Sequence, residues 1–238
     1  MTVVLVHSSD IHVDDDAGWA YTGLIGLRAV LDRARALAAD FVLLAGDTFD
    51  NHRVSAPVLR QAADLITQSG LQVVLLPGNH DPVLPDCLFR RSGLSVHPAV
   101  HVLGVTRAET ILFADHALEI SGRAHRGFGD MAPLYSPASR TARWRVVMAH
   151  GHYVPPKEWA ANAHRSWRIG DHDLAGVDAD YIALGHWDRP AAVGDGSVPA
   201  YYSGSPDLAG TVNVVRLDPV LGVSVSREAL NLSHPTTA

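Results

Sequence analysis

Apolar positions in the first half of the chain alternate between two spacings. Residues 2–6, 41–45 and 71–76 are short apolar runs that end at polar or turn-forming residues, a pattern typical of buried strands. Between them, residues 24–38 and 58–66 place apolar side chains three or four positions apart, which predicts amphipathic helices. This order of strand, helix, strand, helix and strand predicts an α/β fold with parallel strands and helical crossovers.

The second half of the chain has shorter strand candidates and few helical periods. We expect a loop rich in Pro, Ser and Arg over residues 133–143 and a surface excursion over residues 155–174. No internal repeat or low-complexity linker divides the chain, so we expect one domain over residues 1–238, with a loosely ordered tail from about residue 229. Short apolar runs predict further strands at residues 100–105, 110–113, 118–121, 144–149, 181–184, 200–203, 211–217 and 223–226.

Composition narrows the classes of protein that this chain can be. The formal net charge is -6, with 19 Lys and Arg against 25 Asp and Glu, so bulk positive charge does not hold the chain to nucleic acid or to an anionic membrane. The only cysteine, Cys87, excludes an internal disulfide and a cysteine-based zinc cluster and fits a reducing compartment. Residues 1–6 are too short for a signal peptide, and no apolar run reaches membrane-spanning length. We therefore expect a cytoplasmic protein without a membrane partner.

Histidine is abundant, at 14 residues, and several of the histidines follow predicted strands. In an open α/β sheet, the loops after the carboxyl ends of the strands form the ligand crevice. Each short motif taken alone contains residues that are common in turns and helix caps. Turns and caps do not, however, favour histidine, so they do not explain why several histidines follow the strands that line one crevice. The strand exits carry Asp10-Ile11-His12, Gly46-Asp47, Gly78-Asn79-His80-Asp81, His150-Gly151-His152 and Gly185-His186-Trp187-Asp188.

The side chains at these exits are carboxylates, imidazoles and a carboxamide, without thiolate. Such donors suit Mn, Fe or Zn and are poor ligands for Cu(I) or iron–sulfur clusters. Two ions roughly 3.5–4 Å apart need a bridging oxygen, and the motifs supply two clusters of ligands around one carboxylate. The sequence therefore predicts a site for two divalent metal ions, with manganese favoured and Fe, Zn or Mg as alternatives.

In this order, the five motifs resemble those of calcineurin-like metallophosphoesterases, over about residues 5–190. The run Gly78-Asn79-His80-Asp81 after a strand is the most specific of them. Two shorter segments, at residues 46–50 and 202–206, are similar to bacterial SbcCD-type DNA-repair exonuclease subunits. The resemblance implies a four-layer α/β sandwich, with two mixed β-sheets flanked by helices, and the activity of a metal-dependent phosphoric ester hydrolase.

The resemblance also implies a role for each matching residue. His80 would lie beside the phosphate as the proton donor, with Asp81 orienting its ring. The two cations would polarise the phosphoryl oxygens and turn a bridging water into the hydroxide nucleophile. The implied metal ligands are Asp10 and His12 on the first ion, Asp47 between the ions, and Asn79, His150 and His186 on the second.

One position departs from the family pattern, whose last motif has a second histidine, as Gly-His-x-His. This chain has Gly185-His186-Trp187-Asp188 there. We expect Asp188 to bind the first metal through oxygen, because an oxygen donor suits Mn or Mg. The alternative is that the side chain of Asp188 is too short to reach the metal.

The remaining histidines receive no metal role. His7, at the end of the first strand, is expected in the core or behind the ligands, and His52 and His152 are candidate substrate contacts. Others are interpreted as solvated or hydrogen-bonded structural residues, namely His97, His101, His116, His125 and His234.

The expected substrate is a phosphodiester, with nucleotides or nucleic-acid ends as the leading class. Three alternatives stay open at this point: an SbcCD-type DNA exonuclease subunit that needs an ATPase partner, a phosphomonoesterase, and a catalytically weak scaffold of the same fold that binds protein partners. Arginine pairs such as Arg90-Arg91 are candidates for holding a nucleic-acid backbone. The chain ends soon after its last core strands, which leaves little room for the C-terminal extension of SbcCD-type subunits. His80 favours an enzyme, because scaffolds of this fold tend to lose it.

Overall fold

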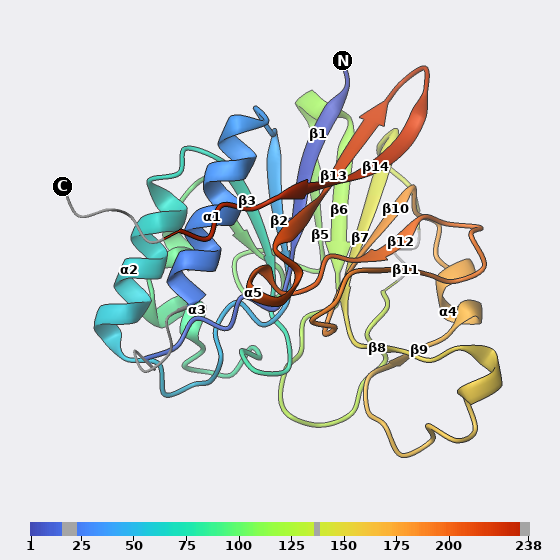
Figure 1. The fold of residues 1–238 in the computed structure, drawn as a ribbon, viewed down its shortest axis with the longest axis horizontal. Helices are drawn as coiled ribbons and strands as arrows, with labels where there is room; N and C mark the ends of the chain where they lie inside the picture. Colours follow the sequence, from blue (N-terminus) through green and yellow to red (C-terminus); the bar gives the residue numbers. More distant parts are fainter. Residues whose placement is uncertain (16–22, 136–138, 234–238) are drawn as a thin grey trace.

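The computed structural model describes residues 1–15, 23–135 and 139–233, and these residues form two six-stranded sheets packed face to face (Figure 1). The first sheet contains β1 (Val3–Ser8), β2 (Phe41–Ala45), β3 (Gln72–Leu76), β4 (Val100–Val102), β13 (Thr211–Asp218) and β14 (Gly222–Ala229). Its strand order is β14-β13-β1-β2-β3-β4. The strands β1 to β4 run parallel, as the alternating pattern predicts, and β13 and β14 add antiparallel strands at one edge.

The second sheet is built from the short strands of the second half of the chain. These are β5 (Thr110–Phe113), β6 (Leu118–Gly122), β7 (Trp144–His150), β10 (Tyr181–Gly185), β11 (Ala191–Val193) and β12 (Ala200–Tyr202). The order is β11-β12-β10-β7-β6-β5, with a parallel centre and an antiparallel strand at each edge. Strand β11, the short run Ala-Ala-Val between Pro190 and Gly194, was not predicted.

Strand β2 shows how the layers are held together. All five of its side chains are buried. Val42 and Leu44 pack against the layer of helices, whereas Phe41, Leu43 and Ala45 pack against the second sheet. Because both faces of the strand are covered, its sequence is a continuous apolar run instead of an alternating one.

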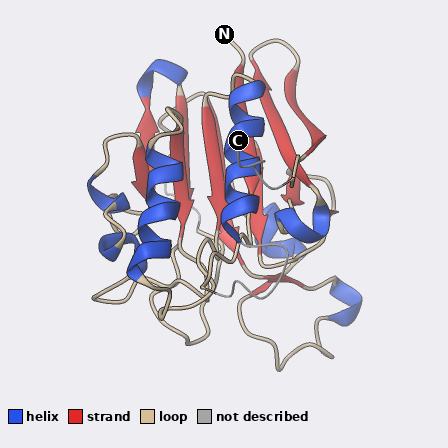
Figure 2. Ribbon diagram, turned by 60° about the vertical axis from the view of Figure 1, so that its left-hand side comes forward, coloured by secondary structure: helices blue, strands red, loops and turns tan. Residues whose placement is uncertain are grey.

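Helices cover the outer face of the first sheet (Figure 2). They are α1 (Gly23–Ala36), α2 (Ala56–Thr67) and the short α3 (Leu88–Arg91). The helix predicted over residues 24–38 ends at Ala36, because Ala38 is left-handed, with φ 49°, and the N–H of Ala39 donates to the carbonyl of Ala34. This is the hydrogen bond of a Schellman-type helix end.

The outer face of the second sheet carries the surface excursion predicted over residues 155–174. That excursion contains a short 3-10 helix (Pro156–Glu158), the strand β9 (Arg168–Ile169), which pairs with β8 (His152–Tyr153), and most of the helix α4 (Asp171–Ala175). Ile169 and Leu174 are buried against the second sheet. A last helix, α5 (Pro206–Ala209), lies near α1, and further 3-10 helices are Leu94–Val96 and Ala114–His116. The expectation of two mixed sheets flanked by helices is confirmed.

Some expectations fall outside the described residues. These are residues 136–138 of the predicted loop and residues 234–238 of the predicted tail, including His234. Strand β14 ends at Ala229, where the tail was expected to begin. The assignment of one domain stays a prediction. Within the described ranges, no helix has the length and apolar character needed to cross a membrane.

Candidate metal centre

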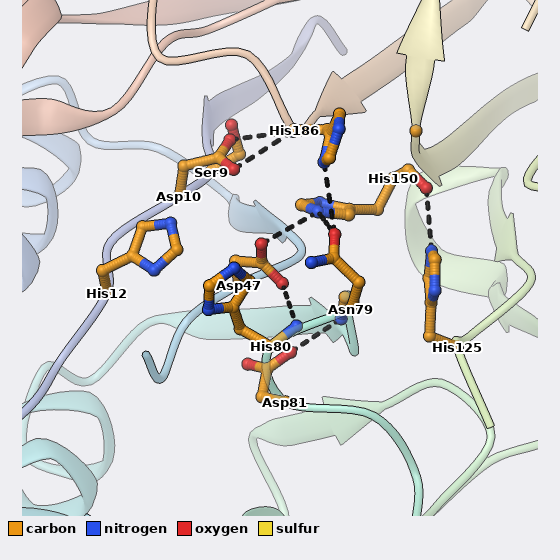
Figure 3. A network of polar contacts seen from close by, with 12 residues as sticks. Ser9, Asp10, His12, Asp47, Asn79, His80, Asp81, His125, His150 and His186 are labelled. Atoms are coloured by element: carbon orange, nitrogen blue, oxygen red, sulfur yellow. Dashed lines mark hydrogen bonds and ion pairs between the residues drawn. The ribbon is translucent and has the colours of Figure 1, made fainter. Parts of the chain in front are cut away.

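The predicted motifs come together where strands of both sheets end (Figure 3). The carboxylates of Asp10 and Asp47 follow β1 and β2 of the first sheet, whereas His150 ends β7 and His186 follows β10 of the second. The first sheet therefore contributes both carboxylates, and the second sheet contributes two of the histidines. The residues that meet there are Asp10, His12, Asp47, Asn79, His80, His150 and His186.

One group of ligand atoms joins Asp47 to two histidines of the second sheet. The ligand atoms of Asp47, His150 and His186 all lie within 4.8 Å of one another. Oδ2 of Asp47 lies 3.1 Å from Nε2 of His150. Oδ1 of Asn79 lies 3.0 Å from the same nitrogen and 3.2 Å from Nδ1 of His186. Two oxygens and two nitrogens therefore converge on a small region.

A second group joins Asp47 to the loop after β1. The ligand atoms of Asp10, His12 and Asp47 also lie within 4.8 Å of one another. Both carboxylate oxygens of Asp10 accept hydrogen bonds from the backbone N–H of His186, at 3.1 and 3.0 Å. Asp47 belongs to both groups, so its carboxylate is placed where two neighbouring ions could share it.

Hydrogen bonds at the far side of the His150 ring decide which nitrogen is free to bind. Nδ1 of His150 lies 2.9 Å from the carbonyl oxygen of Ala45. A carbonyl only accepts, so Nδ1 carries the proton and Nε2 points its lone pair at Asp47 and Asn79 when the ring is neutral. A metal-binding histidine normally has its other nitrogen held in this way.

The charges in the centre are strongly coupled. Burial would lower the pKa of His150, but the adjacent carboxylate of Asp47 raises it to about 9. Burial disfavours the charged form of Asp47, yet His150 holds the pKa of that carboxyl well below its usual range. Burial, together with the charge of His150, lowers the pKa of His186 to about 3, so the His186 ring is neutral and able to bind.

These features fit divalent metal ions. Burial raises the pKa of Asp10, because two carboxylates and little water share the site. Cations would relieve this repulsion, and one held by Asp47 and Nε2 of His150 would take the place of the His150 proton. The donors are carboxylate, carboxamide and imidazole, which suit ions such as Mn, Fe or Zn.

His80 lies at the exposed side of the centre, with 43% of its side chain accessible. Its backbone N–H donates to Oδ1 of Asp47 at 2.9 Å, and its Nδ1 lies 2.6 Å from the carbonyl oxygen of Asp50. The carboxylate of Asp50 lies 3.1 Å from Nδ1 of His12, and His12, Asp50 and His80 form a third group of ligand-type atoms. Asp50 lies in the segment 46–50 that resembles SbcCD-type subunits, and the sequence pattern assigns it no role.

Asp81 is fully buried, and its contacts are with loop backbone. Its carboxylate accepts hydrogen bonds from the N–H of Gly78 at 2.7 Å and of Phe49 at 3.1 Å. Burial and the nearby Asp47 raise the pKa of Asp81 to about 7. Asp81 thus connects the loop after β3, which carries His80, to the loop after β2. The ring of His80 itself contacts Asp50.

Asp188 stands apart from the convergence. It is exposed, and it belongs to none of the three groups of ligand-type atoms found in the described part of the chain. Its backbone carbonyl accepts a hydrogen bond from Ser205 at 3.0 Å. Ligation of a metal by Asp188 stays a prediction.

The backbone of the centre is conformationally costly. Asp10, His12 and Asp47 have φ values of 53°, 50° and 51°, and His186 has φ 105°. Such left-handed residues cost roughly 1–3 kcal/mol each and cluster at functional sites. Gly46, with φ 97°, is required for a second reason, since a Cβ there would lie 2.0 Å from Nδ1 of His150. The strain is held in place by the hydrogen bonds between loops.

Several histidines outside the ligand groups support or border the centre. His125, expected as a structural residue, is fully buried, and its Nε2 lies 2.9 Å from the carbonyl oxygen of His150. His7 is also buried, with Nδ1 2.9 Å from the hydroxyl of Tyr181, as a core residue should be. Nδ1 of His152 accepts a hydrogen bond from the indole of Trp187 at 3.1 Å.

The sequence pattern placed Trp167 within the surface excursion and gave it no part in the metal centre. Its ring lies 5.2 Å from that of His125 and 5.9 Å from that of His186, measured between centroids. No motif links the excursion to the strand exits. The pairing of β9 with β8, next to His150, brings Trp167 to the centre. In the sequence, the only indication that Trp167 has a role is that a large aromatic residue stands between polar ones.

Comparisons with known proteins identify the family and the fold of this chain. The sequence model of the calcineurin-like phosphoesterase family matches residues 3–190. The chain is 28% identical over 204 residues to a subunit of the SbcCD nuclease of Bacillus subtilis (strain 168), an alignment that covers 70% of this chain and 51% of the relative. The chain therefore spans about half the length of this curated relative.

Solved structures share the fold at low sequence identity. NAD nucleotidase of Haemophilus influenzae is 13% identical, with a TM-score of 0.57 over 97% of this chain and 56% of that one. A 5'-nucleotidase precursor from Thermus thermophilus is 16% identical, with a TM-score of 0.56, and the match covers 97% of this chain and 54% of that one. Because the family match covers most of the sequence, the chain belongs to the calcineurin-like phosphoesterase family, whose members are phosphoester hydrolases that depend on divalent metal ions.

Proposed function

We propose that this protein is a dinuclear metal-dependent phosphodiesterase that acts on nucleotides or nucleic-acid ends. The observation that carries the proposal is the pair of ligand groups that share Asp47 where the strands of both sheets end. The nuclease and nucleotidase relatives support the substrate class. The converging ligand atoms speak against a scaffold without catalysis.

The proposed ligand sets follow the two groups of atoms. When bound, the cations would neutralise charge on the phosphoryl oxygens and activate a water molecule as the nucleophile. We propose manganese, because oxygen and imidazole donors suit it, and Fe, Zn and Mg are the alternatives that metal analysis separates. The first ion would be held by Asp10, His12 and Asp47, with Asp188 as a further predicted ligand, and the second by Asp47, Asn79, His150 and His186.

His80 is the proposed proton donor. The carbonyl of Asp50 only accepts, so Nδ1 of His80 carries a proton, and Nε2 is the atom that holds or delivers the second one. Because 43% of the His80 side chain is accessible, we expect Nε2 to approach the leaving oxygen of a bound ester. Asp81 would position His80 through the backbone of its loop, because it accepts from Gly78 and Phe49.

The test compares substrates and variants. Manganese-dependent hydrolysis of bis-p-nitrophenyl phosphate, p-nitrophenyl phosphate and linear DNA is measured for the wild type and for His80→Ala and Asn79→Ala. We expect faster hydrolysis of the diesters than of the monoester, and a loss of about 100-fold or more for both variants. The matched control is His172→Ala, an exposed histidine of α4, which should keep the wild-type rate.

Two outcomes would contradict the proposal. If the wild type and both variants were equally inert in every assay with metals supplied, the assignment as an enzyme would be wrong. If the monoester were the better substrate, the assignment as a diesterase would be wrong. Metal content of Asp188→Ala is measured alongside, and a full complement of two ions per chain would remove Asp188 from the proposed ligands.

A second candidate is an SbcCD-type exonuclease subunit that works with an ATPase partner. It is supported by the 28% identity to the Bacillus subtilis subunit, of which this chain spans about half. If this candidate holds, an ATP-hydrolysing partner should stimulate cleavage of DNA ends by the purified chain. Full activity of the chain alone, unchanged by ATP and partner, would contradict it.

A further inference from the structure

A large apolar side chain stands exposed at the border of the metal centre. Phe128 is 67% accessible, and its ring lies roughly perpendicular to that of His52, with 6.1 Å between centroids. His52 follows Asp50 by two residues, and the carbonyl of Asp50 contacts Nδ1 of His80. The chain of contacts therefore runs from the proposed proton donor to Phe128 through one short loop.

The segment that carries Phe128 is held by hydrogen bonds from Trp167. The indole N–H of Trp167 donates to the carbonyl of Gly129 at 2.9 Å, and its backbone N–H donates to the carboxylate of Asp130 at 2.7 Å. The same indole ring faces His186, 5.9 Å away between centroids. Trp167 therefore contacts both the segment that carries Phe128 and a predicted ligand of the centre.

The backbone of Trp167 supports a positioning role. Its φ is 54°, a left-handed conformation that a bulky residue rarely adopts. The two hydrogen bonds to residues 129 and 130 hold it there. Strain of this kind persists only where the surroundings over-determine it, and it gathers at ligand sites.

The chemistry beside Phe128 suits a nucleotide. A flat apolar ring that is open to solvent can stack on the face of a base, and such stacking tolerates every base. Arg126, two residues earlier, has 60% of its side chain accessible and lies 3.9 Å from its nearest carboxylate, that of Glu109. The exposed part of this guanidinium can contact a phosphate.

We propose that Phe128 is a stacking surface for a nucleobase adjacent to the phosphate in the metal centre, and that Trp167 is the residue that positions it. This inference rests on the proposed function, because it names the group that distinguishes the substrate from other phosphodiesters. Stacking of one base contributes about 1–3 kcal/mol, which corresponds to about 5- to 150-fold in affinity or in kcat/KM.

The experiment removes the base and the ring separately. The substrates are a dinucleotide and two analogues that are abasic on the 5' or the 3' side, cleaved with manganese supplied. In the wild type, one analogue should lose about 5- to 150-fold in kcat/KM. On the dinucleotide, Phe128→Ala should lose the same factor in kcat/KM relative to the wild type. On the abasic analogue that the wild type cleaves less well, Phe128→Ala should have the same kcat/KM as the wild type. Phe128→Tyr should retain the wild-type rate.

Two further variants separate stacking from general damage. Leu221→Ala removes another exposed apolar side chain, 87% accessible, in the turn between β13 and β14 at the opposite end of the first sheet. It should leave every rate unchanged. Trp167→Phe keeps a ring and loses the hydrogen bond to Gly129, so it should raise KM for the dinucleotide and not for the abasic analogue.

A binding measurement decides the inference even if catalysis fails. Calorimetry compares adenosine monophosphate with ribose 5-phosphate on manganese-supplied protein. The wild type should prefer the nucleotide by about 5- to 150-fold, and Phe128→Ala should bind the two alike. If no substrate were cleaved, the proposed function would fail and this preference would still decide the stacking surface. The stacking surface would be overturned if Phe128→Ala lost affinity equally for the ligand with a base and the ligand without one, or if it lost no affinity at all.

Discussion

Gly46→Ala tests whether the close approach of two loops builds the metal centre. A Cβ at this position would lie 2.0 Å from Nδ1 of His150 and 2.4 Å from Cγ of the same ring. Both atoms belong to a fully buried side chain, so the ring cannot turn outward into solvent. The substitution is therefore expected to displace His150 from Ala45 and Asp47.

The magnitude follows from two separate costs. A left-handed alanine costs roughly 1–2 kcal/mol more than glycine. Displacing His150 breaks its buried hydrogen bond to Ala45 and its ion pair with Asp47, and breaking a buried pair costs roughly 3–5 kcal/mol. We expect Gly46→Ala to lower the free energy of unfolding by about 4 kcal/mol or more, a large share of the roughly 5–15 kcal/mol that is typical of a domain.

The chain offers a control that separates these costs. Gly70 is also left-handed, with φ 73°, but a Cβ there would meet nothing within 4 Å. Gly70→Ala should therefore lower the free energy of unfolding by only about 1–2 kcal/mol. Urea denaturation measures both variants, and calorimetry with Mn measures the ions bound. Equal destabilisation of the two variants, with unchanged metal binding, would refute the reasoning.

Three further predictions concern charge. The pKa of His150 is raised to about 9, so below that pH a cation must displace the proton of this ring. Metal affinity measured by calorimetry should therefore rise about tenfold per pH unit from about 7 to 8.5. A flat pH profile of the affinity would contradict this. Asp50→Ala removes the carboxylate next to His12 and should weaken binding of one ion by about 10- to 100-fold, whereas the exposed Asp32→Ala should not. Glu119→Gln leaves the buried Arg145 with a weaker partner at the far end of the second sheet. It should lower the free energy of unfolding by about 3 kcal/mol without changing turnover. A loss of turnover as large as the loss of stability would contradict the view that this ion pair acts on stability alone.

Much of the centre could be predicted from the sequence, because parallel strands place their carboxyl ends together. The exits at Asp10, Asp47 and Asn79 followed strands that an apolar pattern marks plainly. The exits at His150 and His186 lie on a second sheet, and the pattern alone did not indicate that this sheet would face the first. That arrangement came from the resemblance to the family.

Contacts between loops could not be predicted, because they depend on tertiary packing. Asp50 lies in a run of polar residues where an aspartate is ordinary turn chemistry, yet it contacts both His12 and His80. Trp167 and Phe128 are far apart in sequence and meet the centre only after two loops fold over its border. Neither loop has a periodic pattern that would reveal the contact.

The division of the ligands between two layers has a mechanical consequence. Asp10 and Asp47 follow strands of the first sheet, and His150 and His186 belong to the second. Ions held among them would act as a removable cross-link between the sheets, closing long loops of the chain. Chelation should then loosen one sheet against the other and speed amide exchange at the ends of β7 and β10. Binding of the metal ions would thus control the rigidity of the two-sheet sandwich as well as the activity of the site at its edge.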